Sequence, residues 1–249
     1  MSEISPLTIR HVTPPRWGHL PRLAVLLGAL ALGGTGATRA AAEAPADVPA
    51  PGLAAEGQRW WTRSPDPVNP VACATCHDGP AAIRGWAPSF PKVKPLPPPH
   101  ARVMTLLQAN AEAVARHYRL EDPLPAATAI TAYLTALAAD LPVSPGVSPG
   151  QPLFPHRLRQ LEASVSRGAR SFGARCAGCH RPAEVAPVTR RFPRPWPEPP
   201  QSLETFLTGH RPSRPPLDWS DPEMADLVAY LVSHLAGEPL GSPGGSIPP

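Results

Sequence analysis

Two short patterns of cysteine and histidine stand out in this chain of 249 residues. The first, CATCH, runs from Cys73 to His77, and the second, CAGCH, runs from Cys176 to His180. Two cysteines three positions apart on a helical turn project from one face, and the imidazole that follows falls beneath it. C-x-x-C-H is the pattern that attaches haem c, because the thiols bond its two vinyl groups and the imidazole bonds its iron. We therefore predict two covalently bound haem c groups, with thioether bonds and proximal iron ligands supplied by Cys73, Cys76, His77, Cys176, Cys179 and His180.

Other uses of paired cysteines fit the spacing less well. A four-cysteine zinc site usually has 15–20 residues between its two pairs, whereas Cys76 and Cys176 are much farther apart. A thioredoxin-like redox site needs one such pair in a βαβ unit, not two pairs that each precede a histidine. Disulfides are compatible with an exported chain, but they would leave both histidines without a role.

Short helices joined by stiff loops must position these motifs. The chain contains 39 prolines, and proline at that frequency excludes long sheets and long uninterrupted helices. Apolar periodicity and capping residues predict helices that begin near residue 53, cover 101–117, cover 127–140, run around 157–172, begin near 202, and cover 221–235.

The two halves of the chain repeat the same landmarks in the same order. A Gly-x-x-x-aromatic pattern at 57–61 recurs at 168–172, and an Ala-Tyr-Leu segment at 132–134 recurs at 229–231. In each half the C-x-x-C-H motif lies between these two landmarks. The glycine has a physical use, because it lets the first helix of each half cross the last helix closely.

These features resemble tandem class I di-haem cytochromes c over roughly residues 52–237. The resemblance implies an all-α fold with two cytochrome c-like helical haem domains in tandem, and it implies electron transfer as the function. We expect a signal segment at 1–42, a first domain at 52–141, a linker at 142–155, a second domain at 156–238 and a disordered tail at 239–249.

The second axial ligand of each iron departs from that family. There, a methionine in the loop before the last helix completes the coordination. After the first residue this chain has only Met104 and Met224, and both belong to apolar stripes. His117 and His210 instead precede the last predicted helix of each half. We expect these two histidines to be the distal ligands, the alternative being that they are solvated surface residues. For the first haem Met104 is the second choice, and His100 and Tyr118 are further candidates.

The N-terminus predicts export. Basic residues within 10–22 precede an apolar run at 23–34, and small residues at 40–44 offer A-x-A cleavage sites. Twelve apolar residues span about 18 Å as a helix, which is less than the roughly 30 Å of a hydrocarbon core. We predict a periplasmic protein whose signal is removed. The alternative is an uncleaved anchor that associates the protein with the membrane.

Charge and motifs restrict the partners. The formal charge of +4 comes from scattered residues and not from a concentrated stripe, so the predicted partners are redox proteins with an acidic surface and not nucleic acids. The arginines near the second motif would pair with haem propionates or dock a partner, or would be solvated loop charges: Arg181, Arg190, Arg191 and Arg194. The leading function is an electron carrier or an electron-transfer subunit. The alternatives are a haem enzyme, for peroxide reduction or sulfur-compound oxidation, and a haem protein that binds a small ligand at an open iron.

Overall fold

The computed structural model describes residues 52–77, 79–95, 101–195, 198–210 and 215–244. The predicted signal segment and the end of the predicted tail, from residue 245, lie outside the described residues. Within the described ranges, no helix combines the length and the apolar character needed to cross a bilayer.

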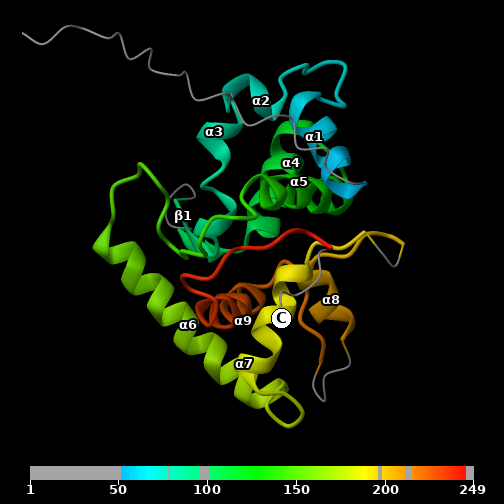
Figure 1. The fold of residues 1–249 in the computed structure, drawn as a ribbon. Helices are drawn as coiled ribbons and strands as arrows, with labels where there is room; N and C mark the ends of the chain where they lie inside the picture. The colour runs from blue at the N-terminus through cyan, green and yellow to red at the C-terminus, as the bar shows by residue number, and fades with distance from the viewer. Residues whose placement is uncertain (1–51, 78, 96–100, 196–197, 211–214, 245–249) are drawn as a thin grey trace, which may run out of the picture. The chain divides into compact units, whose positions relative to one another are not determined.

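The first half of the described chain consists of helices and one small antiparallel sheet (Figure 1). Its helices are α1 (Leu53–Thr62), α2 (Cys73–Cys76), α3 (Pro80–Ile83), the 3-10 turn η1 (Ala87–Ser89), α4 (Leu106–Tyr118) and α5 (Leu124–Leu137). The strands β1 (Lys92–Lys94) and β2 (Arg102–Met104) pair with Val93 opposite Val103. The apolar core of this half gathers around α5, whose residues Ile130 and Leu134 are almost fully buried.

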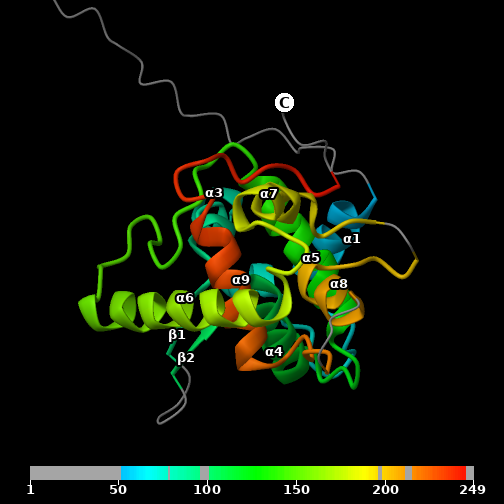
Figure 2. The same cartoon turned by 90° about the horizontal axis from the view of Figure 1, so that it is seen from below.

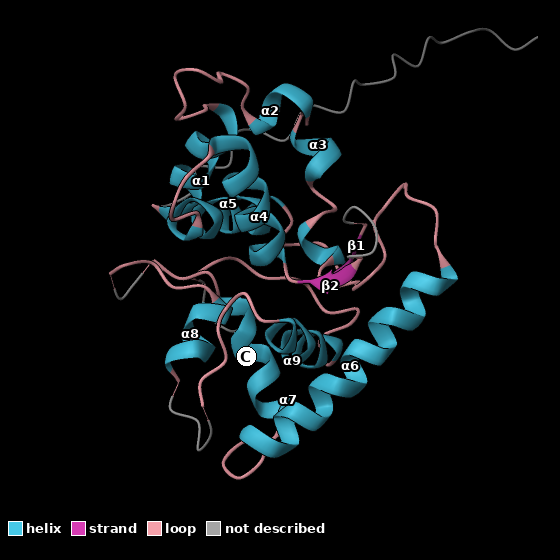
Figure 3. Ribbon diagram, turned by 180° about the vertical axis from the view of Figure 1, so that it is seen from behind, coloured by secondary structure: helices cyan, strands magenta, loops and turns pink. Residues whose placement is uncertain are grey.

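In the second half, the helices and 3-10 turns of the described residues are joined by loops (Figure 3). It contains α6 (Pro155–Arg175), α7 (Pro182–Val185), the 3-10 turn η2 (Ala186–Arg191), α8 (Leu203–Gly209) and α9 (Pro222–Ser233). Its core forms where the C-terminal part of α6 meets α9, around Phe172, Met224 and Leu227. Met224 is fully buried there, in agreement with its place on an apolar stripe.

Two helix crossings, α1 with α5 and α6 with α9, share the same close approach. A Cβ atom on Gly57 would lie 1.9 Å from the carbonyl oxygen of Ala129 in α5. A Cβ atom on Gly168 would likewise lie 1.9 Å from the carbonyl oxygen of Asp226 in α9. In each crossing the nearest side-chain atom is the Cβ atom of the Ala-Tyr-Leu tyrosine, at 2.8 Å. Only glycine permits this backbone separation, so the motif at 57–61 and its counterpart at 168–172 perform the same structural task.

The helix predicted from residue 101 begins later in the structure. Residues Arg102–Met104 form β2, and α4 starts after Thr105. Thr105 caps α4, because its hydroxyl accepts the N–H of Gln108 at 3.2 Å while the Gln108 side chain accepts the N–H of Thr105 at 3.2 Å. This reciprocal pair is a capping box, which fixes the helix start at one residue. The fold is therefore mainly helical, and the short sheet is a feature that the all-α expectation omitted.

The expectation that prolines exclude long helices was wrong for α6, which has 21 residues. The reason is where the prolines lie. Pro155 occupies the first turn of α6, where its missing N–H would have no helical partner in any case. No proline interrupts the rest of this helix, so proline content restricts the loops more than the helices.

The β1–β2 sheet lies against α6 and α9 of the second half (Figure 2). Val93 and Val103 extend from the sheet into an apolar cluster with Leu161 of α6 and with Ala225 and Ala229 of α9. These residues are all buried. The sheet thus contributes to a core shared between the two halves.

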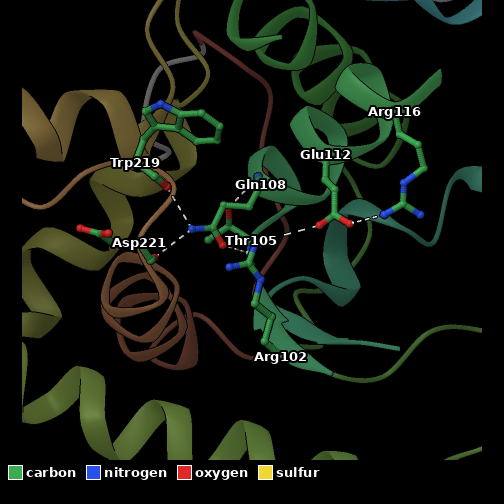
Figure 4. Close-up of polar contacts among 7 residues, drawn as sticks. All are labelled: Arg102, Thr105, Gln108, Glu112, Arg116, Trp219 and Asp221. Carbon is green, nitrogen blue, oxygen red and sulfur yellow. Dashed lines mark hydrogen bonds and ion pairs between the residues drawn. The ribbon is translucent and has the colours of Figure 1, made fainter. Parts of the chain in front are cut away.

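Gln108 makes a second connection between the halves (Figure 4). Its amide nitrogen donates hydrogen bonds to the carbonyl oxygens of Trp219 at 3.0 Å and of Asp221 at 3.1 Å, just before α9 begins. Gln108 is 4% exposed, and a buried side-chain amide with satisfied hydrogen bonds favours a single arrangement of the two segments.

Backbone hydrogen bonds also join residues 139–143 to residues 237–241. The N–H of Val143 donates to the carbonyl oxygen of Glu238, and the N–H of Gly237 donates to the carbonyl oxygen of Val143, each at 2.8 Å. Leu240 donates to Leu141 at 2.9 Å, and its side chain packs against the apolar core. The start of the predicted linker and the start of the predicted tail therefore hold each other in place, where the sequence had predicted a disordered tail from residue 239.

Candidate haem sites

The first C-x-x-C-H motif forms a single helical turn that is fixed by Tyr118. The hydroxyl of Tyr118 accepts the backbone N–H of Cys73 at 3.2 Å and donates to the carbonyl oxygen of Trp60 at 2.7 Å. Burial, together with the hydrogen bond at 3.2 Å between this hydroxyl and the Cys73 thiol, raises the pKa of the Tyr118 hydroxyl. Tyr118 therefore ties the end of α4 to both α1 and the cysteine turn, which engages the hydroxyl that was considered as an iron ligand.

A cavity of about 580 Å³ opens beside this turn. Its volume lies within the roughly 300–1,000 Å³ typical of small-molecule sites. Cys73, Cys76 and His77 all line it, together with apolar and aromatic side chains. The ring of Trp86 stands edge-on to the His77 ring with 4.8 Å between centroids, and Trp61 lies 6.1 Å away. These donors and this apolar lining fit a flat macrocycle bound by two thiols and one imidazole.

One face of α4 also lines the cavity. Its lining residues recur at helical spacing and are Leu106, Ala109, Asn110, Ala113, Val114 and His117. His117 lies in the last turn of α4 and not in the loop before α5. Burial lowers the pKa of His77, and the charges of Lys94 and His117 lower it further. The neutral form of His77, which can bind a metal, is therefore favoured.

Met104 occupies a different place. It ends β2, is 1% exposed, and is not among the described residues that line the cavity. His100 lies outside the described residues.

The second motif begins where α6 ends. Cys176 is the C-terminal cap of α6, and its side chain packs against the apolar cluster that contains Phe172 and Leu227. Backbone N–H groups of Cys179 and His180 both donate to the carbonyl oxygen of Cys176, at 3.0 and 2.9 Å. These bonds close the motif into a turn.

His210 faces His180 across a short gap. It caps the C-terminus of α8, and the centroids of the two imidazole rings are 5.9 Å apart. Phe206, one turn earlier in α8, has its ring 5.1 Å from that of His210. The structure therefore brings together the proximal and distal histidines predicted for the second motif.

Three of the four arginines near the second motif have local side-chain partners. Arg181 pairs with Glu184 and Arg190 pairs with Glu238, each at 3.5 Å. The guanidinium group of Arg194 donates to the Gln201 side chain at 3.1 Å. Their role toward a haem or a partner stays a prediction.

The arrangement does not favour the zinc or disulfide interpretations. All four cysteines are free thiols. Among the residues that the structure describes, no group of three or more His, Cys, Asp or Glu side chains converges on one point. Each cysteine pair instead lies beside its own histidine and its own apolar cluster.

Three charged residues of the first site were not predicted from the sequence. Lys92, Lys94 and Arg157 line the cavity, but they lie outside the C-x-x-C-H motif, so the spacing of that motif does not point to them. The sequence offered one weak signal, which is that Lys92 and Lys94 are the only lysines in the chain.

Comparisons with known proteins agree with this site chemistry. Residues 163–231, which contain the second motif and most of α9, match the family model for cytochrome c oxidase, cbb3-type, subunit III. The crystal structure of SoxXA from P. pantotrophus has a similar fold, with a TM-score of 0.57 and 16% sequence identity, over 76% of this chain and 75% of that chain. No curated protein matches the chain. Together these findings support a c-type cytochrome, a haem protein of the electron-transfer class, with a mainly helical cytochrome c-like fold.

Proposed function

We propose that this chain is an exported di-haem cytochrome c that passes electrons between redox partners, either as a free carrier or as the electron-transfer subunit of an oxidoreductase. The observation that supports this best is the equivalence of the two helix crossings, at Gly57 and at Gly168, each of which leads into one C-x-x-C-H turn. A haem c group supplies an iron that cycles between ferric and ferrous states. The protein supplies its attachment, its axial ligands and its apolar surroundings.

We propose His180 and His210 as the two axial ligands of the second haem. Two imidazoles bound to opposite sides of one metal ion, with bonds of about 2 Å, place their ring centroids roughly 6 Å apart. The 5.9 Å between the two rings fits that arrangement. A further point in its favour is that α8 positions His210 with a backbone bond, because the N–H of His210 donates to the carbonyl oxygen of Phe206 at 2.8 Å.

For the first haem we propose His77 and His117. Both line the same cavity, His77 beside the cysteine turn and His117 in the last turn of α4. Met104 is a poorer candidate because its side chain is buried away from the residues that line the cavity. The two proposed distal ligands would then have equivalent positions. His117 lies in the last turn of α4, before α5, and His210 caps the end of α8, before α9.

Axial ligation can be tested by magnetic circular dichroism of the oxidised protein in the near infrared. A thioether ligand favours ferrous iron and raises the reduction potential, so two bis-histidine haems are expected at lower potentials than histidine–methionine haems. We expect both haems to show bis-histidine charge-transfer bands. A histidine–methionine band at either haem would contradict the ligand assignment.

Carbon monoxide separates an electron carrier from a haem enzyme or a ligand-binding haem protein. If both irons carry two imidazoles, the reduced protein is expected to keep its spectrum when carbon monoxide is added. Rapid binding at one haem would show an open iron and would favour the enzymatic or ligand-binding alternative.

We propose that the redox partners have acidic docking surfaces, because the arginines near the second motif include the exposed Arg181 and Arg191. Association between oppositely charged surfaces becomes slower as ionic strength rises. Electron exchange with an acidic electron-transfer protein should therefore slow as salt is added, and a rate that does not depend on salt would oppose this docking mode.

A further inference from the structure

The charged residues that line the first haem cavity all have the same sign. Lys92 and Lys94 lie on β1, and Arg157 lies in the first turn of α6. No aspartate or glutamate is among the described residues that line this cavity. A partly buried concentration of positive charge is unfavourable unless an anionic group compensates it.

Lys92 has hydroxyl partners and, in the part of the chain that the structure describes, no carboxylate partner. Its amine donates hydrogen bonds to the hydroxyl oxygens of Ser89 at 2.8 Å and of Ser148 at 2.9 Å, and it lies 4.5 Å from the centroid of the Phe90 ring. Within the described residues no carboxylate lies within ion-pair distance of it. Burial lowers the pKa of Lys92 to about 8. Two hydroxyl groups hold the amine in one position but leave its charge unneutralised.

Lys94 has an acidic neighbour that is already engaged. Burial lowers the pKa of Lys94, and the charge of Glu112 partly opposes this effect. The carboxylate of Glu112 pairs with Arg116 at 2.6 Å and with Arg102 at 4.0 Å (Figure 4). Two guanidinium groups therefore share this carboxylate, so it compensates the charge of Lys94 only weakly.

We propose that Lys92 and Lys94 bind the two propionate groups of the first haem. The proposal rests on the proposed function, because it assumes that a haem is attached at Cys73 and Cys76. Two ammonium groups balance two carboxylates, and charge-assisted hydrogen bonds of this kind are stronger than neutral ones. The haem then has a defined orientation, with its thioether edge at α2 and its propionate edge at β1.

The positions of the elements agree with that orientation. Thioether-forming vinyl groups and propionates lie on opposite halves of a porphyrin, so their binding groups must come from separate parts of the cavity wall. In Figures 1 and 3, α3 lies between α2 and β1. Ser148, which positions Lys92, belongs to the segment between the two halves. The propionate edge would therefore face the junction between the first haem site and the second half of the chain.

The test compares Lys92→Gln, Lys94→Gln and Arg102→Gln in the haem-loaded protein. Arg102 is the matched control, because it carries the same charge and lies opposite Lys94 in the register of the β1–β2 sheet. Arg102 is not among the residues that line the cavity. The readouts are the midpoint potential of each haem and the propionate bands in the resonance Raman spectrum. The second haem serves as an internal reference.

We expect both lysine variants to lower the potential of the first haem and to shift its propionate bands, because an uncompensated carboxylate stabilises ferric iron. The second haem and the Arg102→Gln variant should show little change. Lysine variants that resemble Arg102→Gln in both readouts would overturn the proposal. A haem content of two per chain in each variant separates this result from a failure of the proposed function.

A small external anion is the competing occupant of this positive region. Inorganic sulfate provides the probe for it. If sulfate changes the spectrum of the first haem in the unmodified protein and has no effect in Lys92→Gln, the lysines face a solvent anion and the propionate assignment is wrong. We expect sulfate to have no effect, because the propionates already occupy both ammonium groups.

Discussion

At the scale of single residues, the two faces of each proposed haem site differ in how they are encoded. The proposed proximal face comes from five consecutive residues, so spacing alone predicts Cys73, Cys76 and His77 and their second-half counterparts. The distal face comes from residues that the fold brings in from elsewhere. The 5.9 Å between His180 and His210 depends on where α8 ends, and no local pattern encodes that distance. The lysines of β1 were missed for the same reason.

A substitution of His210 tests the distal assignment directly. We expect His210→Ala to leave the second iron with one axial ligand, so that it becomes high-spin and binds carbon monoxide, while the first haem keeps its spectrum. His156→Ala is the control, because His156 is an exposed residue at the start of α6. Absorption spectra of the reduced protein with and without carbon monoxide give the answer. Unchanged spin state in His210→Ala would exclude this histidine as a ligand.

At the scale of the elements, the sequence predicted the helices well and the sheet not at all. Apolar periodicity located α1, α5 and α9, because each packs one face against a core. The strands β1 and β2 have three residues each, which is too short for an alternating pattern to appear. Their pairing is stabilised by tertiary packing of Val93 and Val103 against the second half. Such a contact cannot be read from local sequence.

The glycines at the two helix crossings provide the prediction at this scale. In Gly168→Ala the new methyl group would lie 1.9 Å from a backbone carbonyl oxygen, so α6 and α9 must separate. We expect the free energy of unfolding to fall by about 1–3 kcal/mol or more, since this is the range typical of overpacking. Gly57→Ala should behave in the same way, since its contact distance is the same.

Gly173→Ala is the matched control for these variants. It lies in the same helix as Gly168, and nothing lies within 4 Å of a Cβ atom built there. Replacing glycine with alanine inside a helix at such a position is expected to be neutral or to stabilise by a few tenths to about 1 kcal/mol. Denaturant unfolding followed by far-ultraviolet circular dichroism measures all three. Equal stability of Gly168→Ala and Gly173→Ala would show that close crossing is not required.

At the scale of the whole molecule, the two halves are joined by more than a linker. The shared apolar cluster, the Gln108 amide and the backbone bonds between residues 139–143 and 237–241 all connect them. Glu204 of α8 adds a buried carboxyl group, which is 5% exposed. Burial raises its pKa above the ordinary 4.5, and hydrogen bonds from Thr105 and Ser202 only partly oppose this shift. Thr105 belongs to the first half, so this carboxyl also lies where the halves meet.

The raised pKa of Glu204 predicts how the stability of the protein changes with pH. In the interval between 4.5 and the raised value, the folded protein holds a proton that the unfolded chain has released. The free energy of unfolding should therefore fall as pH rises through this interval. We expect Glu204→Gln to remove that component, because a neutral amide keeps the shape of the protonated carboxyl. Denaturant unfolding at several pH values measures the slope.

Glu184→Gln is the control for the pH dependence, since Glu184 is an exposed carboxylate with a surface ion pair. It should keep the slope of the unmodified protein. If Glu204→Gln and the unmodified protein lose stability equally as pH rises, Glu204 is not the group responsible.

The proposed function requires that one chain carries two covalently attached haems. This is tested by the mass of the denatured protein after expression with the haem c maturation system, combined with variants that lack one cysteine pair. We expect a mass increase of two haems in the unmodified chain, and of one haem in both Cys73→Ala/Cys76→Ala and Cys176→Ala/Cys179→Ala. An unmodified chain that carries one haem or none under conditions of full maturation would contradict it.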